Sequence, residues 1–156
     1  MKIKFITIGK NSDSKIESLI ERYLTRLTHY VKFENLCLSD VKLSKNDSVE
    51  RQKELEWRAI LDVLEISDFV ILLDERGKEY TSRGFADMLD NHQIRGTRTV
   101  VFIVGGPFGF SDTVYKRANH MLALSQMTLT HEMIRLFFVE QVYRAFTLIR
   151  GEGYHH

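Results

Sequence analysis

The stretch TVVFIVGGPFG (residues 99–109) joins a continuous apolar run to a glycine-rich turn. A similar run, Phe69–Leu73, comes earlier in the chain, and Lys2–Ile8 and Val31–Leu38 also have the composition of strands. Uninterrupted apolar runs are typical of strands buried on both faces, as in parallel sheets that helices cover. Segments with helical spacing separate these runs, which gives the order βαβαβαβ. The sequence therefore predicts an α/β fold, an open and mostly parallel sheet flanked by helices.

The helical segments are recognised by apolar residues that recur every three to four positions. The first begins at Ser14-Lys15-Ile16-Glu17, which has the form of a capping box, and Asp47 is expected to cap the second. The last, about residues 132–150, is apolar around most of its circumference, so it must be buried on most of it. One side is expected to meet the sheet. The other either completes the same core or meets a second copy of the chain in a twofold homodimer.

Length and composition limit the class of protein. The 156 residues, 44% of them hydrophobic, fit a single domain spanning residues 1–156. The formal net charge is +1, so binding to nucleic acid would need a local basic patch. The lone cysteine, Cys37, excludes an internal disulfide, fits a reducing cytoplasm and is read as a small core or strand residue. The apolar runs are shorter than the roughly 20 residues that span a membrane, and the histidines lack the spacing of a metal site.

Two loops carry the candidate chemistry. Gly105–Gly109 and Leu124–His131 each follow a strand-like run, and ligands of open α/β sheets bind beyond the carboxyl ends of the strands. The glycine loop has neither the P-loop nor the dinucleotide-binding spacing, so backbone and apolar contacts, rather than phosphates, are expected to hold the ligand. Taken singly, each loop can equally be an ordinary turn, and Thr130 an ordinary helix cap.

Several short motifs occur in a specific order along the whole chain: Leu72-Leu73-Asp74, Gly77-Lys78, Ile103-Val104-Gly105-Gly106-Pro107 with Gly109, Leu124-Ser125, Met127-Thr128-Leu129 with His131, Arg135, Glu140-Gln141-Val142-Tyr143-Arg144-Ala145 and Tyr154-His155. In this order and spacing they resemble the ribosomal RNA large subunit methyltransferase H family. That family methylates N3 of a pseudouridine and belongs to the SPOUT class of knotted methyltransferases.

The resemblance implies a deep trefoil knot in the C-terminal part of the chain and S-adenosylmethionine (SAM) as the methyl donor. It also implies action on the large-subunit RNA of an assembled ribosome, and the homodimer stays the expectation drawn from the last helix. SAM carries no phosphate, which agrees with the lack of a phosphate motif, and its methyl group is electrophilic without a metal. By matching positions, the cofactor pocket is expected to be lined by Leu72, Leu73, Gly105, Gly106, Leu124, Ser125, Gln126, Met127, Thr128 and Leu129.

The same resemblance suggests the catalytic residues. N3 of pseudouridine carries a proton that must leave, and histidine is the natural base near neutral pH. His155 is the first candidate, with hydrogen bonding to RNA or to the neighbouring subunit as its alternative role. Tyr154 is expected to stack on the target base or to hold its carbonyl. His131 is expected either to take a direct chemical role or to support the cofactor loop and the last helix.

Contact with RNA is expected from Arg135, Arg144 and His156. For the two arginines, ion pairs with Glu132 or Glu140 one turn away are an equal alternative. The chain departs from the family pattern at Thr130, where many relatives have proline, and at His156, where relatives often have arginine. Two rival functions therefore stay open: a knotted methyltransferase of transfer RNA, and a ribosome-binding factor without catalytic activity.

Overall fold

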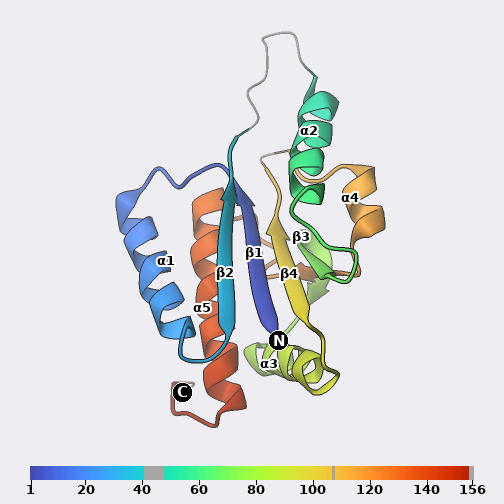
Figure 1. Cartoon of the computed structure of the whole chain (residues 1–156). Coiled ribbons are helices and arrows are strands. Elements are labelled where there is room, and N and C mark those ends of the chain that lie inside the picture. The colour runs from blue at the N-terminus through green and yellow to red at the C-terminus, as the bar shows by residue number, and fades with distance from the viewer. Residues whose placement is uncertain (41–47, 107, 155–156) are drawn as a thin grey trace.

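The computed structural model describes residues 1–40, 48–106 and 108–154. Within these ranges one parallel sheet has the strand order β2-β1-β4-β3-β5 (Figure 1). Its strands are β1 (Lys2–Ile8), β2 (Lys32–Leu38), β3 (Phe69–Glu79), β4 (Thr99–Val104) and β5 (His120–Ala123). The sheet confirms the predicted open α/β fold. Cys37 lies on β2, at the edge of the sheet, where it is exposed rather than in the core.

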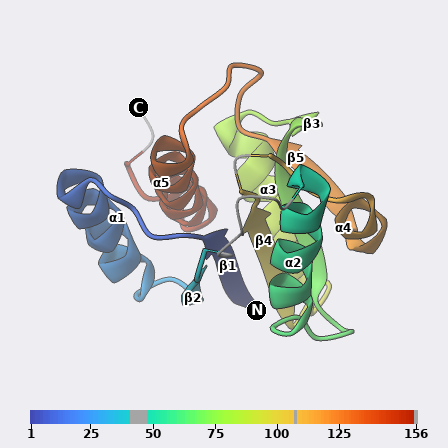
Figure 2. The ribbon, with the colours of Figure 1, turned by 90° about the horizontal axis from the view of Figure 1, so that it is seen from above.

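Helices cover both faces of the sheet: α1 (Ser14–Leu27), α2 (Val49–Leu61), α3 (Ser82–Ile94), α4 (Asp112–Arg117) and α5 (His131–Ile149). The helices α1, α3 and α5 pack against one face, and α2 and α4 cover the other (Figure 2). The short helix α4 was not predicted from the sequence. In the described part of the chain, no helix is both long and apolar enough to cross a membrane.

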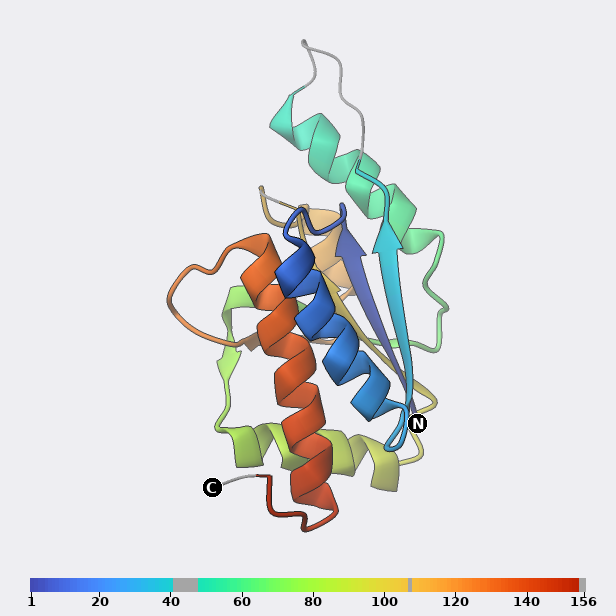
Figure 3. The same ribbon diagram turned by 90° about the vertical axis from the view of Figure 1, so that its left-hand side faces the viewer.

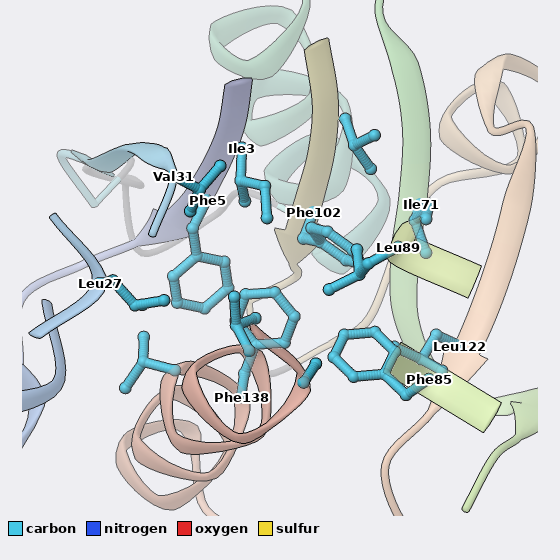
Figure 4. Close-up of a cluster of buried hydrophobic side chains, with 14 of the residues drawn as sticks. Ile3, Phe5, Leu27, Val31, Ile71, Phe85, Leu89, Phe102, Leu122 and Phe138 are labelled. Atoms are coloured by element: carbon cyan, nitrogen blue, oxygen red, sulfur yellow. The ribbon is translucent and has the colours of Figure 1, made fainter. Parts of the chain in front are cut away.

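The two-sided burial of the central strands explains their uninterrupted apolar sequences. Phe5 of β1 and Phe102 of β4 point to the same face, where both meet Phe138 of α5, with ring centroids 4.4 and 4.7 Å from it (Figure 4). Val101 and Ile103 of β4 point to the opposite face, into the core below α2 and α4. Each fully buried side chain of this size contributes about 1.5–3 kcal/mol to stability.

The helix α5 is buried on most of its surface because it contacts the sheet and also both α1 and α3. The sequence predicts two apolar stripes on this helix, one that includes Phe138 and Val142 and one that includes Val139 and Phe146. All four of these residues lie in the same core. Of the two alternatives for the second stripe, the structure shows the one in which it completes the same core. Phe137 is the exception, since it is 45% exposed. The predicted homodimer is not required to explain the pattern and stays a prediction.

One predicted helix cap, that of α1, is wrong by one residue, and the cap predicted for α2 lies outside the described residues. The cap of α1 is Asp13, whose Oδ1 accepts a hydrogen bond from the backbone N–H of Lys15 at 2.7 Å. Ser14 is already inside the helix, and the carboxylate of Glu17 binds the side chain of Asn11 instead of closing a capping box. Ser48 caps α2, while Asp47 lies outside the described residues.

The strand β3 extends beyond the predicted end at Leu73 and continues to Glu79 after an irregularity. Leu73 and Lys78 both pair with Leu122 of β5, so the residues between them bulge out of the ladder. At Gly77 an added Cβ would lie 2.6 Å from the backbone of β5. Only glycine allows this close approach, which explains the Gly77-Lys78 motif.

Candidate cofactor pocket

A cavity of about 640 Å³ lies at the carboxyl ends of β4 and β5, beside the bulge of β3. Its wall is formed by residues 73–76 of β3, by the segments that follow β4 and β5, by Lys53 of α2, by α4, and by the first turn of α5. This is where open α/β sheets bind ligands. The segment between β5 and α5 projects at one side of this end of the sheet and leads into α5 (Figure 3).

Most of the residues predicted for the pocket come together here. Eight of them line the cavity: Leu73, Gly105, Gly106, Leu124, Ser125, Met127, Thr128 and Leu129. Leu72 and Gln126 are not part of its wall. Leu72 is fully buried on the opposite face of the sheet because successive strand residues alternate in direction. The amide of Gln126 instead donates a hydrogen bond to Glu79 at 2.9 Å.

The glycine loop after β4 is enclosed on two sides. A Cβ at Gly105 would lie 3.1 Å from the ring of Phe110, and one at Gly106 would lie 2.7 Å from Oε2 of Glu56. The loop closes with a hydrogen bond of 3.0 Å from the N–H of Gly109 to the carbonyl of Gly106. Gly109 has a φ of +73°, which other residues rarely adopt. The loop is therefore a tight turn and at the same time a bare backbone wall of the cavity.

The second loop joins β5 to α5 through local hydrogen bonds. The hydroxyl of Ser125 accepts from the N–H of Met127 at 2.9 Å, and that of Thr130 accepts from the N–H of Met133 at 3.3 Å. Thr130 is thus the N-cap of α5, as predicted. Met127 is 79% exposed. The loop is ordered at both ends, while its middle stands open to solvent beside the cavity.

A polar cluster in the cavity wall was not identified as part of the site from the sequence. Asp74 follows the buried part of β3, and its carboxylate accepts hydrogen bonds from Tyr115 at 2.5 Å and from Nε of Arg76 at 3.2 Å. Burial would raise the pKa of Asp74, but these bonds outweigh burial and hold the pKa below its usual value. Burial and the bond to Asp74 raise the pKa of Tyr115 to about 12. Asp74 was visible as the first polar residue after a buried strand, whereas Tyr115 belongs to the unpredicted α4.

The cavity and Tyr154 lie at different levels of α5. His131, the first residue of α5, lines the cavity. Tyr154 follows α5 in sequence, and its side chain packs beside Glu140, about 13 Å along the helix axis from His131. The two candidates are therefore not brought together within one chain. His155 and His156 lie outside the described residues.

Tyr154 packs among polar and aromatic groups of α1 and α5. Its hydroxyl lies 3.2 Å from Oε1 of Glu140 and 3.4 Å from the hydroxyl of Tyr23. Its ring contacts Tyr143 at a centroid distance of 4.9 Å, and the guanidinium of Arg144 lies 4.8 Å from its centroid. Burial and the neighbouring hydroxyl raise the pKa of Tyr154 far above its usual value.

The two arginines predicted to contact RNA have other partners in the structure. Arg144 forms an ion pair with Glu140 at 2.6 Å, which is the alternative that the sequence allowed. Arg135 is only 6% exposed, and its guanidinium donates to the carbonyls of Ile8 and Gly9. The prediction that Arg135 contacts RNA does not fit this position, because the end of β1 occupies its donors. Among the described residues, no three His, Cys, Asp or Glu side chains gather as a metal site would require.

Comparisons with known proteins show which family the chain belongs to. The family model described as "Predicted SPOUT methyltransferase" matches residues 1–155. The chain is 46% identical over 156 residues to a Christiangramia forsetii protein named ribosomal RNA large subunit methyltransferase H, with coverage of 100% of this chain and 99% of that protein. A Flavobacterium johnsoniae protein of the same name is 47% identical, with the same coverage.

A solved structure supports the fold. The chain matches a probable methylase family protein from Haemophilus influenzae with a TM-score of 0.56 and 15% identity. The match covers 96% of this chain and 66% of that protein. At this identity the likeness concerns the fold alone. The full-length family match and the near-complete coverage of relatives at 46–47% identity decide the question of membership. The chain belongs to the SPOUT methyltransferase family.

Proposed function

We propose that this protein transfers a methyl group from SAM to N3 of a pseudouridine in large-subunit ribosomal RNA, on the assembled ribosome and in the cytoplasm. The observation that carries the proposal is the cavity at the carboxyl ends of β4 and β5 and the bulge of β3, which unites eight residues predicted for the cofactor. The names of the full-length relatives support the choice of substrate.

The composition of the cavity fits SAM. Its volume of about 640 Å³ lies in the usual range for cofactor sites. SAM needs an apolar slot for its adenine, acceptors for its ammonium and donors for its carboxylate. The wall offers all three kinds of group. Its apolar side chains are Val104, Leu124, Leu129 and Ile134, its acceptors are the carboxylates of Asp74, Glu75 and Asp112, and its cationic donors are Lys53 and Arg76. The bare backbone of Gly105 and Gly106 allows close approach of the ligand.

The reaction requires that N3 of the pseudouridine lose its proton and that N3 be aligned with the methyl group of SAM. When bound, the sulfonium supplies an electrophilic methyl group. N3 of the base must lose its proton, and a histidine within hydrogen-bond reach can take it. We infer that His155 is this base and that Tyr154 holds the base ring. The imidazole of His131 lies in the cavity wall, where it supports the cofactor loop or acts directly.

The position of Tyr154 favours a shared active site. The C-terminal tail is the segment from Tyr154 onward. The side chain of Tyr154 packs beside Glu140 of its own chain, about 13 Å along the axis of α5 from His131, which lines the cavity. In a twofold homodimer, the tail of one subunit can instead complete the cavity of the other. We propose this dimer, together with the deep trefoil knot around the cofactor loops that the family resemblance implies.

The test is methyl transfer from labelled SAM. The substrates are intact ribosomes from a strain that lacks the modification, naked ribosomal RNA and transfer RNA. Label that maps to N3 of one pseudouridine in intact ribosomes is the expected result. Label in transfer RNA alone would overturn the substrate. Binding of SAM without transfer to any RNA would favour a non-catalytic ribosome-binding factor.

A further inference from the structure

The first turn of α5 sends its side chains in two directions. His131 and Ile134, three residues apart, line the cavity. Glu132 and Arg135, also three residues apart, contact the segment between β1 and α1, residues 9–13. Residues three apart lie on the same side of a helix, so the two pairs occupy neighbouring sides of a single turn. A rotation or shift of this turn therefore moves both sets of contacts.

Glu132 holds the start of α1. Its Oε1 accepts hydrogen bonds from the N–H of Ser12 at 2.5 Å, the hydroxyl of Ser12 at 2.8 Å and the N–H of Asp13 at 3.1 Å. These bonds hold the pKa of Glu132 below its usual value, so the carboxylate is charged at neutral pH. Because Asp13 is the N-cap of α1, the contact joins the first turns of α1 and α5.

Arg135 holds the end of β1. Its guanidinium donates to the carbonyl of Ile8 at 2.5 Å, to the carbonyl of Gly9 at 2.7 Å and to the side chain of Asn11 at 2.9 Å. It is 6% exposed, and within the described residues its Nε has no hydrogen-bond partner. A buried cation satisfied mainly by carbonyls tolerates little displacement. The backbone turns at Gly9, which has a φ of +73°, a conformation that glycine adopts without strain.

We propose that Glu132 and Arg135 are positioning residues of the cofactor pocket, which link residues 9–13 to the cavity through the first turn of α5. The inference rests on the proposed function, because SAM is the ligand of the cavity. Neither side chain lines the cavity. Linkage is reciprocal: occupation of the cavity stabilises the contacts of residues 9–13, and loss of these contacts weakens binding.

The test measures SAM affinity by calorimetry and amide hydrogen exchange at Ser12 and Asp13, using the full chain. In the wild type, SAM should slow exchange at these two amides. In Glu132→Ala the slowing should vanish and the dissociation constant should rise about five- to tenfold, a typical size of coupling between sites. Ser12→Ala, a milder change, should raise the dissociation constant about twofold. Glu21→Gln, on the exposed side of α1, is the control and should change neither measurement.

The outcomes separate the two proposals. Unchanged exchange at Ser12 and Asp13 on SAM binding, or wild-type affinity in Glu132→Ala, would overturn the positioning role. A lower melting temperature of Glu132→Ala without loss of affinity would also count against it. If the wild type itself does not bind SAM, the proposed function fails and this inference fails with it.

Discussion

Gly106 shows how one residue can serve both the fold and the pocket. Its Cα faces the carboxylate of Glu56, which is 6% exposed and accepts a hydrogen bond from Gln52 at 2.9 Å. There is no room for a side chain on this side, and on the other side the loop backbone lines the cavity. The glycine loop thus keeps its backbone bare because its rear is packed against α2.

Replacing Gly106 by valine should abolish SAM binding, or weaken it more than tenfold. The new side chain has to displace Glu56 or push the loop into the cavity, and overpacking of this kind costs about 1–3 kcal/mol. Calorimetry with SAM, together with thermal unfolding, checks the prediction. Gly84→Ala in α3, where the nearest atom to the new Cβ is 3.3 Å away, is the control for a glycine outside the pocket. Unchanged affinity in Gly106→Val would remove this loop from the site.

Two residues, Leu72 and Tyr115, show what could not be predicted from the sequence alone. The motif Leu72-Leu73-Asp74 led to two leucines in the pocket, but strand alternation puts only Leu73 there. Asp74 was present in the motif, yet its partner Tyr115 is distant in sequence and comes from another element. Pairing of this kind depends on the folded chain, so no local pattern could have revealed it.

Among the elements, the second part of the pairing of β3 with β5 depends on one close approach. The pairing resumes at Lys78 and Glu79 after the bulge, where Gly77 leaves no room for a Cβ beside the backbone of β5. The residues that bulge out before it, Asp74–Arg76, form one side of the cavity. The irregular strand therefore builds part of the site.

Gly77→Ala should destabilise the fold by about 3 kcal/mol, since an added Cβ would meet rigid backbone atoms rather than a movable side chain. Denaturant unfolding measures the loss. Gly84→Ala, in a helix, should stay within about 1 kcal/mol of the wild type. Equal stability of the two variants would contradict the close approach of β3 and β5.

Two partly buried histidines, His120 on β5 and His92 on α3, make stability depend on pH. Burial lowers the pKa of His120, and the charge of Lys78 lowers it further; burial and the charge of Arg95 lower the pKa of His92. Below about pH 6.5 the unfolded chain therefore binds protons before the folded chain does. Stability is complete above this pH and falls as the pH drops through the lowered values.

The melting temperature should accordingly decrease from pH 7 to pH 5, and His120→Gln should make this decrease smaller. His29→Gln, in the exposed turn after α1, controls for the loss of a histidine elsewhere. A decrease in His120→Gln as steep as in the wild type would show that other groups cause it.

The elements differ in how well the sequence predicted them. Long apolar runs identified the strands and the layered fold, because burial on both faces leaves a clear pattern. The caps at Asp13 and Ser48 each have a neighbour of similar chemistry, so the sequence placed them one residue away. The six residues of α4 are too few to have a recognisable period. The trefoil knot came only from the family resemblance and stays a prediction.

At the scale of the whole molecule, the long axis of α5 separates the two halves of the proposed active site. The cavity wall includes its first residue, His131, whereas the side chain of Tyr154 packs further along the helix, on Glu140, and on Tyr23 of α1. A single chain thus holds Tyr154 away from its own pocket. Two chains related by a twofold axis can bring the pocket of one chain and Tyr154 of the other together.

Mixing two inactive variants tests this arrangement. Gly106→Val has an intact tail, and a chain lacking residues 154–156 has an intact cavity and should still bind SAM. Neither variant by itself should methylate ribosomes. Refolded together, they should recover about a quarter of the wild-type activity, because half of randomly formed dimers are mixed and each mixed dimer has one complete site. No recovery, with mixed dimers verified by mass, would mean that the tail acts on its own chain.

The strand order has a consequence for how the protein is made. β4 lies between β1 and β3 but is synthesised after both. As the chain emerges from the ribosome, β1 can pair with β2 at once, whereas β3 has no place in the sheet until residues 99–104 have been added. The cavity wall is complete only when residue 134 is in place, and α5, which fills the core, is the last element. A nascent chain therefore holds an unfinished sheet until β4 and β5 have been added, and its cavity lacks part of the wall until the first turn of α5 has been made.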